Sequence, residues 1–357
     1  MALIIFILII AVLILVHELG HFWAARRNGV GVDEFAIGFP PRLWSKKSKK
    51  TGTEYSINAI PLGGYTKLHG EERGTDNKSF VKKSVWSRFK IISAGVLMNL
   101  VLAYVLLTVY FAISGSPLAT DPTRYNSFIN SKKSEVVVVS VLDNSQAKAM
   151  GLQSGDAILE INGQSVIDSN AFGDYTSTRT GQAVSLKINR NNQITTLDGT
   201  IGKSNGKGSI GVEISNYYPE IHYKWWAVPL MAGLDLYNVV VLTLYFFWNL
   251  ILVLFHHAQP LGEVVGPVGV YFVARQAIQM GFTYVLRLMI LLSINLAIIN
   301  FLPFPALDGG RALFLLIEKI RGKKVNEATE SVIHLIGFVI LILLIIGISV
   351  RDVLKLF

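Results

Sequence analysis

The sequence predicts a membrane protein of the α-helical class, a bundle of about four transmembrane helices with one soluble domain inserted between them. Hydrophobic residues make up 51% of the 357 residues and charged residues only 16%, so the chain is less polar than a typical soluble globule. Four apolar segments have about the length that crosses a bilayer, at residues 3–25, 91–113, 284–302 and 332–348. A polar stretch, residues 114–223, separates the second segment from the third.

Composition also excludes several kinds of chemistry. The sequence contains no cysteine, so disulfides, thiolate metal ligands and cysteine nucleophiles are excluded, and a metal must be held by His, Asp or Glu. The net charge is +9, and residues 26–90 hold fourteen basic and six acidic side chains. Because this basic stretch lies between two apolar spans, we interpret it as a cytoplasmic loop and not as a nucleic-acid surface. The apolar start has no basic residue ahead of it and no clear cleavage site, so we interpret it as a retained span.

Four parts follow from these shifts in composition. They are an N-terminal membrane part (1–113), the soluble domain (114–223), a linker with amphipathic or interfacial helices (224–283) and a C-terminal membrane part (284–357). Residues 53–60 and 62–68 alternate in the manner of strands on either side of Pro61. They predict a small β-hairpin that dips toward the membrane and offers an edge to an extended substrate, with plain loop packing as the alternative.

The soluble domain is predicted to mix strands with short helices. Ser145 can cap a short helix that Gly151 ends, and Asn162-Gly163 is a strong hairpin turn. The expected strands are residues 135–142, 157–161, 183–189 and 194–201.

The first apolar segment carries the sequence His17-Glu18-Leu19-Gly20-His21. Helical positions four apart share a face, so the two histidines can bind one metal ion. Glu18 can then act as general base on a metal-bound water, as in the HExxH metalloproteases. A chance match is the alternative, but ionisable groups on a membrane helix are costly and usually functional.

A catalytic zinc usually takes three protein ligands, and the third must come from elsewhere in the chain. Asp308 is the strongest candidate, because it follows two prolines that bend the chain and precedes two glycines that permit close approach. The alternative is that Asp308 caps a helix. The weaker rivals are Asp235, Glu263, His256 and His257, whereas His69, His222 and His334 are interpreted as ordinary surface or interfacial residues.

Charge sets the expected topology. Basic loops after the first span and near residues 319–324 should both be cytoplasmic, which places the soluble domain and both termini outside. An odd number of crossings must then connect residues 223 and 319, so we expect residues 227–255 to lie along or dip into the membrane. A six-span arrangement is the alternative. Asn99, a polar group in the second span, supports the metal site or joins helices through a hydrogen bond.

These residues resemble the site-2 protease family of intramembrane zinc metalloproteases, in particular the bacterial regulator-of-sigma-E protease branch. Residues 17–21 match its first motif, and residues 300–309 match Asn-x-x-Pro-x-Pro-x-Leu-Asp-Gly. Residues 60–65 resemble its membrane-reentrant β-loop, and residues 145–166 resemble a PDZ domain. Two short stretches depart from the family pattern: Gly38-Phe39 is followed by Pro40 where Gly is usual, and Ala94-Gly95 by Val96 where Pro is usual.

The resemblance implies that His17, His21 and Asp308 bind Zn²⁺ and that Glu18 is the base. The residues that it assigns to substrate binding are Asn300, Pro303, Pro305, Ile60, Gly63, Gly64 and Tyr65. It implies regulated cleavage of single-span membrane proteins of the anti-sigma-factor type and of signal-peptide remnants, in the cytoplasmic (inner) membrane. It also implies one extracytoplasmic PDZ domain that takes peptide C-termini. The rival hypotheses are a protease of soluble or prenylated chains and a membrane scaffold without proteolysis.

Overall fold

The structure is a computed structural model that describes residues 1–71, 74–190, 193–204, 206–256 and 265–354. The chain forms two compact units. The first, called here the membrane unit, comprises Met1–Tyr110 and Pro229–Phe357. The second, called the inserted domain, comprises Phe111–Val228.

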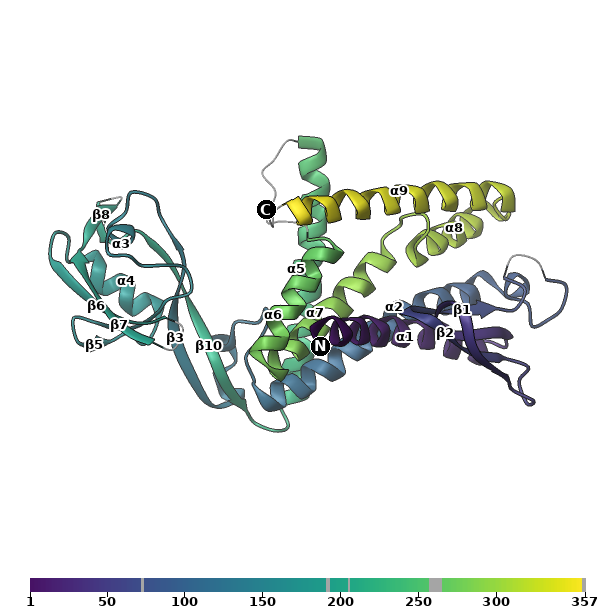
Figure 1. Cartoon of the computed structure of the whole chain (residues 1–357), viewed down its shortest axis with the longest axis horizontal. Coiled ribbons are helices and arrows are strands. Elements are labelled where there is room, and N and C mark those ends of the chain that lie inside the picture. Colours follow the sequence, from purple (N-terminus) through teal and green to yellow (C-terminus); the bar gives the residue numbers. More distant parts are fainter. Residues whose placement is uncertain (72–73, 191–192, 205, 257–264, 355–357) are drawn as a thin grey trace. The chain divides into compact units, whose positions relative to one another are not determined.

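The membrane unit is helical apart from one small sheet (Figure 1). Its helices are α1 (Ala2–Arg27), α2 (Val85–Ile113), α5 (Val228–His256), α6 (Pro267–Met280), α7 (Phe282–Phe301), α8 (Asp308–Arg321) and α9 (Glu327–Leu354). Among the described residues, five helices are long and apolar enough to cross a membrane: α1, α2, α7, α9 and the Val228–Leu250 part of α5. The chain is therefore a membrane protein with several apolar helices. The four predicted spans correspond to α1, α2, α7 and α9. The fifth helix that could cross is α5, which corresponds to the predicted interfacial segment 227–255.

Helix α5 has a different direction from α1 and α9. In Figure 1 it runs steeply across the lines of α1 and α9. Parallel helices stay parallel in any projection, so α5 is not parallel to those two. Its exposed side chains include Tyr237, Tyr245 and Trp248, a type of residue that is enriched at membrane–water interfaces.

The small sheet consists of two long bent strands, β1 (Val32–Lys47) and β2 (Glu54–Leu68). Residues 32–37 pair with residues 64–68 on one side and with residues 54–57 on the other. Residues 42–47 pair with the outer side of residues 54–58. Residues 64–68 therefore form one edge of the sheet, and we call them the edge segment.

The two ends of this sheet differ in polarity. One end carries Lys46, Lys47, Lys49 and Lys50, all exposed. At the other end Gly63 lies against Ile14 of α1, and Phe39 and Ile60 are 44% exposed although both are apolar. The sheet therefore has one basic end and one apolar end, and the apolar end adjoins α1.

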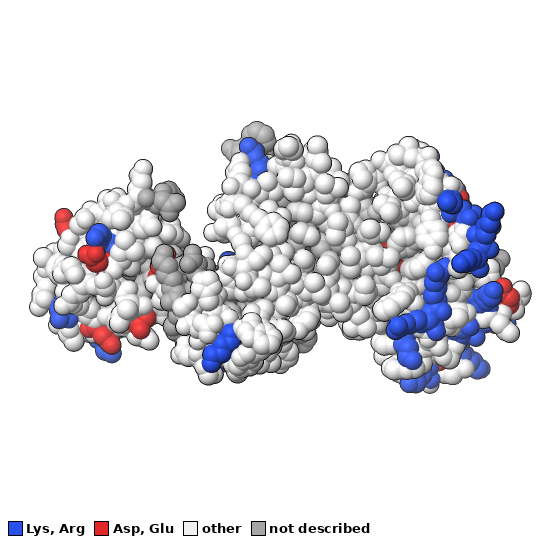
Figure 2. Space-filling model, turned by 90° about the horizontal axis from the view of Figure 1, so that it is seen from below, with Lys and Arg blue, Asp and Glu red and all other residues white. Residues whose placement is uncertain are grey.

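Basic side chains gather at one end of the membrane unit, the end that holds β1, β2 and α8 (Figure 2). The patch includes Arg26 and Arg27 at the end of α1 and Lys319 and Arg321 in the last turn of α8, all exposed. Under this end a small core joins α1, β1, β2, α2 and α8, with Ala25, Val32, Leu68, Ile91, Ile92 and Leu315 among its buried members. The basic charge of the membrane unit is thus concentrated at one end.

The inserted domain is an antiparallel sheet with two short helices. Its strands lie in the order β10-β3-β4-β6-β7, and β5 pairs with β4. Their bounds are β3 (Ile129–Val141), β4 (Ala157–Ile161), β5 (Gln164–Ser165), β6 (Ala183–Arg190), β7 (Gln193–Thr200) and β10 (Val212–Tyr223). The remaining elements are α3 (Gln146–Ala149), α4 (Ser169–Ser177), the pair β8 (Gly202–Ser204) and β9 (Lys207–Ser209), and the 3₁₀ segments Phe80–Lys82 of the membrane unit and Pro122–Phe128.

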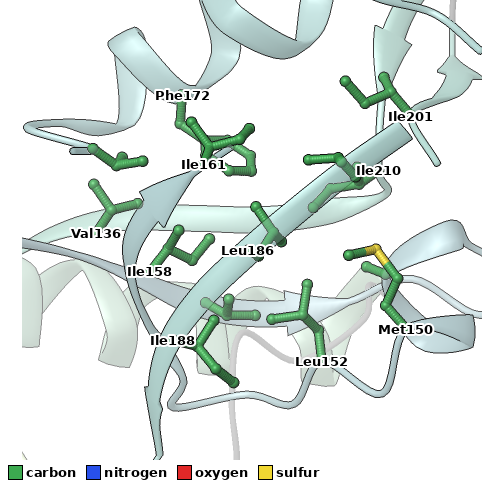
Figure 3. Packing of buried hydrophobic residues seen from close by; sticks show 14 residues of the cluster. Val136, Met150, Leu152, Ile158, Ile161, Phe172, Leu186, Ile188, Ile201 and Ile210 are labelled. Atoms are coloured by element: carbon green, nitrogen blue, oxygen red, sulfur yellow. The ribbon is translucent and has the colours of Figure 1, made fainter. Parts of the chain in front are cut away.

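Local sequence signals explain this domain well. Ser145 caps α3 by accepting a hydrogen bond from the Lys148 backbone N–H at 3.2 Å, and the predicted strand 157–161 is β4. In β6, Val184, Leu186 and Ile188 alternate with more exposed residues and point into one core. Figure 3 shows that this core also takes Ile158 from β4 and Phe172 from α4, together with side chains from the intervening loops.

Candidate active site

His17 and His21 lie one turn apart on α1, and each ring is fixed through its Nδ1 atom. The Nδ1 of His21 donates to the backbone carbonyl of Ile91 at 2.9 Å. The Nδ1 of His17 lies 3.4 Å from the side-chain amide of the fully buried Asn99. Both rings therefore turn Nε2 the same way, and these atoms are 3.1 Å apart. Zinc-binding histidines usually donate their second N–H to an acceptor of the kind that the Ile91 carbonyl provides for His21.

Asp308 reaches the same point from the other end of the sequence. Its Oδ2 lies 3.0 Å from Nε2 of His17 and 3.2 Å from Nε2 of His21. Leu307 occupies the N-cap position of α8, and Asp308 is the first residue of that helix. The carboxylate thus faces the imidazoles, which disfavours the alternative that it serves as a helix cap.

Two glycines bring α1 and α2 close enough to form this cluster. A Cβ on Gly20 would lie 2.3 Å from the carbonyl oxygen of Ala94. A Cβ on Gly95 would lie 2.5 Å from Nε2 of His21 and 2.7 Å from Nε2 of His17. All three distances are shorter than any van der Waals contact, so larger residues would separate the helices or displace the rings.

A cavity of about 330 Å³ opens beside the cluster. His21, Asp308 and the half-buried Glu18 line it, and so does most of the edge segment, Tyr65, Thr66, Lys67 and Leu68. The hydroxyl of Thr66 donates to the backbone oxygen of Glu18 at 3.1 Å, which ties the edge segment to α1. A carboxylate, the histidine–aspartate cluster and an unpaired strand edge therefore share one cavity.

The other predicted substrate residues are placed differently. Of the described side chains that line the cavity, Tyr65 is the only one from that group, and Gly64 adjoins it with its backbone against Ala36. The remaining five, Ile60, Gly63, Asn300, Pro303 and Pro305, lie outside the cavity lining. Asn300 is half-buried near the end of α7, and Pro303 is exposed.

The hairpin expectation needs one correction. The sequence predicts that this hairpin, residues 53–60 and 62–68, offers an edge to an extended substrate. Residues 54–57 are instead paired on both sides, so the part of β2 that lines the cavity and has an open edge is the edge segment. The sequence could not show this, because strand β1 was not predicted and its bend places residues 54–57 inside the sheet.

His334 is the site-linked residue that sequence reasoning missed, since we interpreted it as an ordinary surface or interfacial residue. It lies on α9, and its Nδ1 accepts a hydrogen bond from the backbone N–H of Ala306 at 2.9 Å. Ala306 stands two residues before Asp308. A histidine near the start of an apolar span was the signal available in the sequence.

The donor set fits zinc. Zinc bonds of about 2.0–2.2 Å at tetrahedral angles separate neighbouring donor atoms by about 3.4 Å. The three nearest donor separations here are 3.0, 3.1 and 3.2 Å. Among the described residues, His17, His21 and Asp308 form the one group of metal-ligand side chains whose ligand atoms all lie this close together. Asp235 is buried on α5 outside this group, whereas His257 and Glu263 lie outside the described residues.

One apolar helix carries a His-Glu-x-x-His turn, and an aspartate that is distant in sequence lies next to it in space. This arrangement defines a class of protein, the membrane metallopeptidases. The comparison with protein families identifies the particular family. The model of peptidase family M50 matches residues 5–344, and the chain belongs to this family.

Curated relatives agree with this assignment. Proteins named as zinc metalloproteases in Fusobacterium nucleatum and Clostridium acetobutylicum are 32% and 33% identical to this chain. The alignments cover 100% of both chains for the first, and 97% of this chain and 96% of the relative for the second. The regulator of sigma-W protease RasP of Bacillus subtilis is 28% identical, over 99% of this chain and 98% of its own length. The protein is thus a zinc metalloprotease.

Two solved structures resemble part of the chain. The PDZ domain of an SdrC-like protein from Listeria innocua is 30% identical and covers 22% of this chain and 92% of its own, with a TM-score of 0.21. The corresponding domain from Listeria monocytogenes is 29% identical and has the same TM-score, 0.21.

Proposed function

We propose that this protein is an intramembrane endopeptidase that cuts single-span membrane proteins. The observation that carries the proposal is the convergence of His17, His21 and Asp308 next to a cavity that Glu18 also lines. The three convergent side chains would hold Zn²⁺. When bound, the ion would polarise the scissile carbonyl and make its water more acidic.

The chain's own residues then have separate roles. Glu18 takes the proton of the attacking water and passes it to the leaving amine, because it shares the cavity with His21 and Asp308. The carbonyl of Ile91 accepts from Nδ1 of His21 and so keeps that imidazole in the tautomer with a free Nε2, while Asn99 contacts Nδ1 of His17 and restrains the orientation of its ring. The Gly20–Gly95 contact keeps the two helices close.

The substrate must lose its helix before it can be cut, because a membrane helix hides its peptide bonds. The edge segment would hold the unwound chain as an added strand, and this follows from its open edge and its place in the cavity wall. Five further residues would contact the substrate before it enters the cavity, since they lie outside the cavity lining: Asn300, Pro303, Pro305, Ile60 and Gly63.

Membrane placement and partners belong to the same proposal. The basic end of the membrane unit would face the cytoplasm of a cell whose inner membrane holds the protein, with the inserted domain and both termini outside. The inserted domain would act as a PDZ domain that takes peptide C-termini. Because a relative is named a regulator of sigma-W protease, we propose substrates of the anti-sigma-factor type, and signal-peptide remnants as further substrates.

Glu18→Gln tests the proposed chemistry. The purified variant should bind zinc as the wild type does, because the amide leaves the three ligand atoms in place. Cleavage of a synthetic single-span substrate in liposomes should fall at least about 100-fold, since the general base is lost. The matched control is Glu213→Gln in the inserted domain, which should keep both properties. Full cleavage by Glu18→Gln would refute the assigned role.

A further inference from the structure

The segment that delivers Asp308 has an unusual backbone. Ala306 has φ of +77°, in the left-handed region that residues other than glycine rarely adopt. Its N–H donates to His334 on α9, at 2.9 Å. An alanine keeps such a conformation only where its surroundings enforce it, so the contact with α9 is part of what shapes this segment.

A second contact comes from the same face of α9. Gly337 lies three residues after His334, so both face the same neighbour. A Cβ on Gly337 would lie 2.4 Å from Cβ of Pro305 and 2.7 Å from its carbonyl oxygen. The segment 305–306 therefore contacts α9 directly. Ala306 donates a hydrogen bond to His334, and Pro305 packs against Gly337.

The tautomer and the orientation of the His334 ring suit this role. Its Nε2 lies 3.9 Å from the carboxylate of Glu330, one turn earlier on α9. Because the N–H of Ala306 donates to Nδ1, that nitrogen carries no proton, and the neutral ring has its proton on Nε2. The ring also packs against Phe314 of α8, with centroids 5.4 Å apart. The ring is thus held by the hydrogen bond from Ala306 and by its packing against Phe314.

We infer that His334 is a positioning residue that, together with Gly337, holds the segment before Asp308 in the conformation that aims its carboxylate at His17 and His21. This inference rests on the proposed function, in which Asp308 is a zinc ligand. Without the hydrogen bond, Ala306 can leave the left-handed region. The change in its backbone dihedral angles then moves Asp308, two residues later. The ligand triad then loses its preorganised third member.

The first test compares two substitutions of His334. His334→Leu removes the acceptor, whereas His334→Asn places an amide oxygen near the position of Nδ1. In the zinc-free protein, hydrogen exchange of the amides of Ala306 and Leu307 should be faster in His334→Leu and close to wild type in His334→Asn. Zinc affinity, measured by competition with a chromophoric chelator, should fall about 10–100-fold in His334→Leu and recover in His334→Asn.

The second test uses two glycines of the same helix. Gly337→Ala should weaken zinc binding, because its methyl group displaces Pro305. Gly347→Ala is the matched control, since nothing lies within 4 Å of a Cβ at that position. The visible spectrum of the cobalt-substituted protein should change for Gly337→Ala and His334→Leu and stay unchanged for Gly347→Ala, because it reports the ligand geometry.

Asp308→Asn separates this inference from the proposed function. If Asp308→Asn binds zinc as tightly as the wild type, Asp308 is not a ligand and the proposed function is wrong. If Asp308→Asn loses zinc while His334→Leu keeps wild-type affinity and exchange, the positioning role alone is overturned. Equal losses in His334→Leu and His334→Asn also overturn it, because the acceptor atom would then not be the cause.

Discussion

Single residues without any reactive group decide whether the metal ligands can meet. Gly95 is the clearest case, because the space that a side chain would fill is taken by the rings of His17 and His21. Gly20 makes the corresponding approach from α1 onto Ala94. In a bilayer, small residues of this kind allow two helices to approach closely. Here that closeness also determines the position of both imidazoles.

Gly95→Ala should therefore damage the site rather than only the fold. The added methyl group must push the rings aside, and overpacking of this kind costs about 1–3 kcal/mol. We expect lower zinc content after dialysis and slower cleavage. Gly233→Ala on α5 is the control, because a Cβ there meets its nearest atom at an ordinary 3.7 Å. Wild-type zinc content in Gly95→Ala would contradict the close contact.

At the scale of elements, the sheet formed by β1 and β2 presents two different edges. The edge segment lines the cavity and is tied to α1 by Thr66. The opposite edge, residues 42–47, carries basic residues and is not among the described residues that line the cavity. Only the edge segment can present an extended chain to Glu18. We therefore expect the substrate to pair with the edge segment and not with residues 42–47.

The absence of cysteine allows a direct test of this difference. In a Glu18→Gln background, Lys67→Cys should form a disulfide with a cysteine placed near the cleavage point of a single-span substrate. Lys46→Cys, an equally exposed lysine on the opposite edge, should not. Non-reducing gels measure both products. Equal cross-linking of the two positions would argue against strand addition at the edge segment.

At the scale of the whole molecule, the count of membrane crossings depends on α5. Length and composition allow it to cross, but its direction differs from that of α1 and α9 (Figure 1). The proposed topology requires an odd number of crossings between the inserted domain and α8. With α7 as that crossing, α5 must lie along or dip into the membrane.

Single-cysteine labelling with a membrane-impermeant maleimide checks this arrangement. Trp225→Cys and Val265→Cys flank α5, and both side chains are exposed. If α5 does not cross, both positions should react in intact cells, whereas Lys46→Cys should react only after lysis. Protection of Val265→Cys in intact cells, with labelling after lysis, would show that α5 crosses and would require another crossing before Asp308.

The sequence by itself determined what depends on neighbours along the chain. A helix places His17 and His21 on one face whatever surrounds them, and apolar length, basic loops, Ser145 and the Asn162-Gly163 turn act locally as well. It reduced Asp308 to two alternatives, ligand or cap. Tertiary structure alone decided which way that carboxylate points, which part of β2 keeps an open edge and that His334 supports the segment before Asp308. The reason is physical, because each of these depends on contacts between residues far apart in sequence, and local periodicity carries no information about such contacts.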